Sequence, residues 1–135
     1  MNKVYTWLPR IALLLCGAML CFVGVSGVMD PTMISGDALL QPDGVTSIRV
    51  DYGGFHLGLG LFALFGLFKS NYAKSSLIAA TITMVLVVVT RLSGIEIDGA
   101  NEAQYSILTA EALVCSFAVI GLVAFLLKGN PAKTA

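Results

Sequence analysis

Four long stretches of the chain are almost free of charge, and this feature constrains the fold more than any other. The stretches are residues 11–29, 52–68, 75–92 and 105–127. As α-helices that rise about 1.5 Å per residue, the shortest would be ~26 Å long and the longest ~34 Å. The hydrocarbon core of a bilayer is about 30 Å thick, so each stretch can cross it, the second with help from flanking residues. We therefore expect an all-α fold, a bundle of four transmembrane helices.

The amino-acid composition points to the same class of protein. Hydrophobic residues make up 57% of the 135 residues and charged residues only 12%, against roughly 25% charged in ordinary soluble domains. The net charge is zero and no basic patch is present, so we do not expect nucleic-acid binding. The four stretches leave almost no sequence for a water-soluble domain, and we expect residues 1–135 to form a single integral membrane domain.

Turn-forming residues separate the four stretches. The longest connection runs from Asp30 to Val50 and is expected to be irregular, with the apolar residues 38–40 lying at the membrane interface. The expected turns and breaks are at residues 41–44, 69–74, 93–94, 98–101 and 129–131.

Charged residues are distributed unequally between the two sides of the expected bundle. Six positive residues and no acid precede the first stretch, join the second to the third or follow the fourth: Lys3, Arg10, Lys69, Lys74, Lys128 and Lys133. All eight acids lie on or toward the other side. Because positive residues are retained in the cytoplasm, we expect an up-down-up-down topology with both termini cytoplasmic, in a bacterial inner membrane. Trp7 and Tyr105, near helix ends, fit interfacial aromatic belts.

The first stretch could alternatively belong to a cleaved signal peptide. Lys3 and Arg10 precede its apolar run, and the small residues Val25–Gly27 follow it, which is the pattern of such a segment. We interpret the stretch instead as a retained transmembrane helix.

Three cysteines, Cys16, Cys21 and Cys115, lie inside the expected helices. They show no CxxC or Cys/His spacing, so we expect them to pack as small apolar residues rather than to bind zinc or an iron–sulfur cluster. The sequence contains no Gly-rich phosphate loop and no nucleophile elbow. We therefore expect no metal site and no cofactor.

Five ionisable residues are expected in one layer of the membrane, near the outer ends of the second, third and fourth helices. They are Arg49, Asp51, His56, Arg91 and Glu111. An isolated charge at such a depth costs at least ~2.5–3.5 kcal/mol, but arginines and carboxylates can neutralise one another. We expect Glu111 to pair with Arg91 or Arg49, and His56 to be hydrogen-bonded nearby.

Two interpretations of this cluster stay open. The ion pair can be structural and fix the rotation and register of the helices. Alternatively, ionisable groups within a membrane mark ligand or proton sites. In that case the cluster would open toward the outer leaflet and receive a polar head with an apolar tail, between walls formed by Leu57, Leu108 and Val114.

The second stretch is rich in glycine. The glycines expected to form helix contacts are Gly53, Gly54, Gly58 and Gly60. Gly54 and Gly58 are four residues apart, a spacing that lets another helix approach closely. These glycines can serve compact packing within the chain, or they can form a flat face that docks a partner membrane protein or a second copy.

Residues 49–60, RVDYGGFHLGLG, resemble the signature stretch of a bacterial family of small four-helix membrane proteins. That family is known as domain of unknown function forty-three forty-five. Residues 90–94, TRLSG, followed by Asp98–Gly99, resemble its second signature, and Glu111 matches the acid of its last helix. The resemblance covers nearly the whole chain and implies a four-helix inner-membrane bundle. It implies no activity.

Three classes of function remain for such a chain. We expect a non-catalytic accessory, assembly or scaffold subunit of a membrane complex, with membrane lipids, a partner membrane protein or a second copy as its neighbours. The first alternative is a binder of a lipid-like or quinone-like ligand at the outer polar cluster. The second is a membrane enzyme that uses His56 and Glu111 as an acid–base pair.

Overall fold

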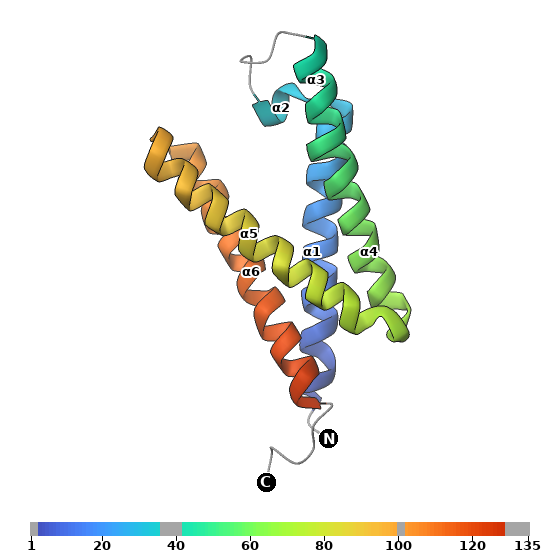
Figure 1. Ribbon diagram of the computed structural model, residues 1–135. Coiled ribbons are helices and arrows are strands. Elements are labelled where there is room, and N and C mark those ends of the chain that lie inside the picture. The colour runs from blue at the N-terminus through green and yellow to red at the C-terminus, as the bar shows by residue number, and fades with distance from the viewer. Residues whose placement is uncertain (1–2, 36–41, 100–101, 129–135) are drawn as a thin grey trace.

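A computed structural model describes residues 3–35, 42–99 and 102–128, and every regular element in these ranges is helical (Figure 1). Four runs of helix are long and apolar enough to cross a membrane: Val4–Met29, Gly44–Phe68, Ser70–Asp98 and Glu102–Lys128. The chain thus has the all-α architecture of a multi-pass membrane protein. The beginning of α1 and the end of α6 lie at the same end of the molecule (Figure 1).

The first and last of these runs are single helices, α1 (Val4–Met29) and α6 (Glu102–Lys128). The second run joins a short helix, a π-helical segment and an α-helix, and the third begins with a short 3₁₀ turn. The bounds of the remaining elements are α2 Thr32–Ser35, α3 Pro42–Ile48, η2 Arg49–Phe55, α4 His56–Phe68, η3 Ser70–Tyr72 and α5 Ala73–Asp98.

The connection between the first two membrane helices is more helical than the sequence predicted. Thr32–Ser35 forms one helical turn, and α3, which leads into the second membrane run, already begins at Pro42, where a turn was expected. Proline is favourable at the first position of a helix because its missing N–H has no partner there and its φ angle is already helical. Pro42 therefore starts this helix instead of reversing the chain. Residues 38–40 and 129–131, for which we had expectations, lie outside the described residues.

The expected break at Ser93–Gly94 was also wrong, because α5 continues through both residues to Asp98. One glycine costs a helix only about 1 kcal/mol relative to alanine. The Ser93 hydroxyl also stays within the helix and donates to the carbonyl of Val89 at 3.0 Å. The helix ends at Gly99, whose φ of 79° lies in the left-handed region that favours glycine.

The core lies where all four long helices meet, with α1 packed against α4 and α6, and α5 packed against the same two helices. Its largest fully buried side chains are Leu13, Leu20, Leu77, Met84, Cys16 and Ser76. Cys16 is an apolar core residue, and all three cysteines are free thiols.

The two halves of the bundle are packed unequally. The buried residues of α5 all lie in its first half, from Ser76 to Met84, and none lies between Val85 and Asp98. Figure 1 shows that the α5–α6 pair diverges from the α1–α4 pair toward the end where α5 leads into α6. The second half of α5 therefore lies away from the other two helices. The expected polar cluster falls in this diverging half.

Candidate functional site: a polar cluster in the diverging half

Arg91 of α5 and Glu111 of α6 form a two-pronged ion pair. The Arg91 Nη2 donates to Glu111 Oε1 at 2.7 Å, and its Nε donates to Glu111 Oε2. The Glu111 side chain is 7% exposed and that of Arg91 26%. The guanidinium group thus occupies both carboxylate oxygens, which is the geometry in which arginine binds carboxylates most strongly.

Gln104 completes this group, because its side-chain oxygen accepts a hydrogen bond of 2.8 Å from Arg91 Nη1. Gln104 and Glu111 are seven residues apart, or about two helical turns, so both lie on one face of α6. Sequence reasoning missed Gln104, although that spacing could have revealed it. We call Arg91, Gln104 and Glu111 the arginine cluster.

The arginine cluster is neutral and internally satisfied. Among the described residues, no buried side-chain nitrogen or oxygen atom lacks a hydrogen-bond partner. α6 runs back along α5, and this arrangement brings residues 20 positions apart into contact. Glu111 therefore pairs with the first of the two arginines that depth and charge had singled out.

The other three expected residues, Arg49, Asp51 and His56, lie on the second membrane run, at η2 and the start of α4. Arg49 is close to Asp30 at the end of α1, where it acts on a carboxylate that already accepts a hydrogen bond from Thr32. The Thr32 hydroxyl is the main reason that the pKa of Asp30 is lowered, and the charge of Arg49 adds to the same effect. The charge of Arg49 thus acts on Asp30 at the end of α1, whereas Glu111 pairs with Arg91.

His56 is held by its own helix. Its Nδ1 lies 3.4 Å from the carbonyl oxygen of Asp51, and its ring stacks on Tyr52, with centroids 5.4 Å apart and planes within 5°. Tyr52 also lies within electrostatic range of Arg91. Tyr52 is thus the neighbour that relates His56 to the arginine cluster.

Two of the three apolar wall residues expected for a ligand pocket pack against α1 or the core instead. Leu57 packs against Gly24 of α1, and Val114 packs against the core formed around Cys16 and Met84. The pairing of both Glu111 oxygens with Arg91 also does not favour His56 and Glu111 as an acid–base pair. Among the described residues, no group of three or more histidines, cysteines and acids could hold a metal ion.

The four glycines of the second run have two different environments. A Cβ atom at Gly53 would lie 2.6 Å from the Val28 side chain, and one at Gly60 would lie 2.6 Å from the backbone nitrogen of Cys21. These two glycines are therefore in tight contact with α1. In contrast, a Cβ atom at Gly54 or Gly58 would meet nothing within 4 Å.

Gly54 and Gly58 form the floor of an open groove of about 390 Å³ on the outside of the molecule. Its sides are apolar and are formed by Val50, Phe55 and Leu59. Phe55 is 66% exposed. We call this surface the glycine groove.

Comparison with known proteins places the chain in a family. No match is found among curated proteins or among solved structures. The family model described as "Domain of unknown function (DUF4345)" matches residues 8–127, which is nearly the whole chain. The matched segment includes the arginine cluster, the stacked Tyr52 and His56, and the glycine groove. The chain therefore belongs to the DUF4345 family, as its two signature stretches predicted.

Proposed function

We propose that this protein is a non-catalytic accessory, assembly or scaffold subunit of a bacterial inner-membrane complex. In this proposal the glycine groove receives a transmembrane helix of the partner protein. The four helices run up-down-up-down and both termini are cytoplasmic, because the end that carries the termini is rich in lysine and arginine and holds no acid.

The observation that carries the proposal is the open environment of Gly54 and Gly58. Each glycine in a helix costs about 1 kcal/mol relative to alanine. Gly53 and Gly60 offset this by bringing α1 close, but Gly54 and Gly58 contact no neighbouring element. Small residues four positions apart let a second helix approach closely, and the packing contacts that result drive helix association in lipid.

The chemistry of the groove defines the kind of partner. Its floor is backbone and glycine, and its sides are aliphatic or aromatic, with no charged side chain among the residues that line it. An apolar transmembrane helix with its own small-residue face fits such a surface. A water-soluble peptide would leave its backbone polar groups unsatisfied at this depth.

The direct test is purification of the tagged chain from native membranes in mild detergent, followed by quantitative mass spectrometry of the proteins that co-purify. Gly58→Leu fills the groove and should lower recovery of the partner at least about tenfold, which corresponds to 1.4 kcal/mol. Ala18→Leu is the matched control, because Ala18 is an exposed small residue on α1. Equal partner recovery from both variants would contradict the proposal.

A second candidate function is the binding of a lipid-like or quinone-like molecule at the polar groups of the diverging half. It is favoured by the stacked Tyr52 and His56 rings, which take no part in the Arg91–Glu111 ion pair although Tyr52 lies within electrostatic range of Arg91. The same purification separates the two candidates. A defined lipid or quinone without a stoichiometric protein would favour this one, and His56→Leu should then lower ligand retention without lowering folded yield.

The orientation is tested by labelling single added cysteines with an impermeant thiol reagent in intact cells. Asp98→Cys, at the end of α5, should react, and Asn71→Cys, in the η3 turn, should not. Both residues are exposed, so the opposite labelling pattern would reverse the proposed orientation.

A further inference from the structure

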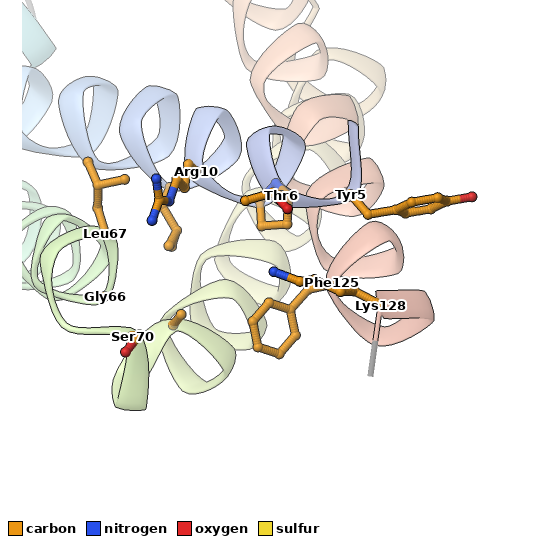
Figure 2. A pocket seen from close by; sticks show the side chains of 11 residues that line it. Tyr5, Thr6, Arg10, Gly66, Leu67, Ser70, Phe125 and Lys128 are labelled. Carbon is orange, nitrogen blue, oxygen red and sulfur yellow. The ribbon is translucent and has the colours of Figure 1, made fainter. Parts of the chain in front are cut away.

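A second cavity lies at the opposite end of the molecule, where α1 begins and α6 ends. It encloses about 140 Å³ between the first turns of α1, the turn that joins α4 to α5, and the last turns of α6. Figure 2 shows the residues that line it. This cavity lies at the other end of the helices from the polar cluster and from the glycine groove.

Two positive side chains border the cavity from opposite sides, Arg10 of α1 and Lys128 of α6. In Figure 2 the Lys128 amine extends across the Phe125 ring toward Thr6, whereas the Tyr5 hydroxyl points away. Neither cation has an acidic partner among the described residues, where the single ion pair found is Arg91–Glu111. The guanidinium of Arg10 lies 5.8 Å from the centre of the Trp7 ring.

The charge around this cavity is uncompensated. Lys3, Lys69 and Lys74 belong to the same end of the molecule, and the described segments at this end contain no acid. Cations that lie together without counter-charges attract an anion.

The border of the cavity is positively charged, whereas its interior is lined by apolar side chains and hydroxyl groups. Leu13, Leu67 and Phe125 provide apolar walls, and Thr6 and Ser70 provide hydroxyl groups that can donate hydrogen bonds. Trp7 is 57% exposed and lies one helical turn from Arg10, which is the placement of a residue at a membrane interface. A site with cations, hydroxyls and apolar walls at this depth matches an amphipathic anion.

We propose that this cavity binds the phosphate headgroup of an anionic phospholipid from the leaflet that surrounds this end of the bundle. Arg10 and Lys128 hold the phosphate from two sides, and the hydroxyls of Thr6 and Ser70 donate to its remaining oxygens. The first methylene groups of the lipid lie against Leu13 and Phe125. Basic pockets between transmembrane helices commonly recognise lipid headgroups in this way.

The proposal is tested with the full chain reconstituted in nanodiscs or detergent and examined by native mass spectrometry. The probes are phosphatidylglycerol, phosphatidylcholine and inorganic phosphate. Phosphatidylglycerol should be retained at least about tenfold more strongly than phosphatidylcholine, and millimolar inorganic phosphate should not displace it. Equal retention of the two lipids would overturn the proposal. Inorganic phosphate that binds as tightly as phosphatidylglycerol would assign the site to a free anion and overturn the lipid assignment.

Charge-removing variants locate the binding. Lys128→Gln and Arg10→Gln should each lower retention of phosphatidylglycerol about five- to tenfold, and Arg10→Lys should restore most of it. Lys74→Gln is the matched control, because Lys74 is exposed at the same end but does not line the cavity. A loss of the same size in Lys74→Gln would show general attraction to an anionic surface and overturn the site. Partner recovery in the same preparations reports separately on the glycine groove.

Discussion

The two helix pairs of this protein are held together in opposite ways. The seam between α1 and the second membrane run is closed by glycines, with Gly17, Gly24, Gly53 and Gly60 bringing backbones into contact. The seam between α5 and α6 in the diverging half is closed by the arginine cluster. The first seam depends on the absence of side-chain volume and the second on the presence of a charge pair.

Because of this difference, the two seams are sensitive to different kinds of substitution. The close contacts that the structure shows for Gly17, Gly24, Gly53 and Gly60 are with uncharged residues, so this seam is sensitive to added volume rather than to a change of charge. The arginine cluster lies where α5 buries no residue after Met84, so added volume can be tolerated there. Removal of one charge, however, leaves its partner unpaired in a medium of low dielectric constant.

The largest effect is expected from breaking the ion pair. Glu111→Gln keeps the shape of the side chain but leaves the Arg91 charge unpaired, which typically costs about 3–5 kcal/mol in a buried pair. We expect the lower end of this range, because the Arg91 side chain is 26% exposed. The free energy of unfolding in detergent, measured by denaturant titration, checks the prediction.

The double variant Arg91→Gln/Glu111→Gln is the control for this prediction. It removes both charges and should regain part of the lost stability, since no unpaired charge remains. Strictly additive losses from the two substitutions would show that the pair does not act as a unit.

The next effect concerns two glycines on the same helix that differ in environment. Gly60→Ala places a Cβ atom 2.6 Å from the Cys21 backbone nitrogen and 3.0 Å from the Gly17 carbonyl oxygen, neither of which can move without shifting α1. We expect a loss of about 1–3 kcal/mol of unfolding free energy, the usual penalty of overpacking. Thermal denaturation of the purified chain measures it.

Gly58→Ala is the matched control, because its Cβ atom would meet nothing within 4 Å. In the isolated chain it should be neutral or should stabilise the protein by up to about 1 kcal/mol through its higher helix propensity. Equal destabilisation by both alanines would contradict the assignment of Gly60 to the α1 seam and of Gly58 to an open face.

A smaller effect is expected at the third member of the arginine cluster. Gln104→Leu removes the acceptor for Arg91 Nη1 but keeps the ion pair. Hydrogen bonds between membrane helices average about 0.6 kcal/mol and reach about 1.7 kcal/mol, so we expect a loss of about 1 kcal/mol. In the background of Glu111→Gln the same substitution should have a different effect. An unchanged loss in that background would separate Gln104 from the cluster.

The smallest effect is expected at the end of α1, outside both seams. The hydrogen bond from Thr32 lowers the pKa of Asp30 below 3.8, so the ionised carboxylate is favoured in the folded state. Its stabilising contribution is complete above pH 3.8 and is lost as the pH falls through the lowered pKa. Thr32→Val should raise the pKa of Asp30 toward 3.8, as measured by NMR titration. A pKa unchanged by Thr32→Val would contradict this role of the hydroxyl.

The sequence predicted the four membrane helices because each apolar stretch is long enough to cross a bilayer, and the short turn-forming segments only separate them. It also predicted that Glu111 would pair with Arg91 or Arg49, since few charges lie at that depth and only opposite charges can share it; the structure shows the pair with Arg91. Local signals were less reliable. Pro42 and Gly94 were interpreted as breaks, but proline can start a helix and a single glycine does not stop a long one.

The placement of Arg49 and of the glycines could not be predicted, because it depends on how helix pairs turn relative to one another. Arg49 and Arg91 are equivalent by depth, and only the divergence of the two pairs places Arg49 near Asp30. In the same way Gly58 and Gly60 are two residues apart, and the rotation of α4 decides which of them meets α1. A periodic pattern gives the spacing of side chains on a helix but does not identify the neighbour of each face.

The divergence of the α5–α6 pair has a consequence for the surrounding membrane. A bundle whose helices spread apart at one end has a wider cross-section in one leaflet than in the other, as a wedge does. In the wider half, α5 buries none of its residues after Met84, whereas in the narrower half it packs into the common core. The shape of the protein thereby introduces a difference in lateral area between the two leaflets.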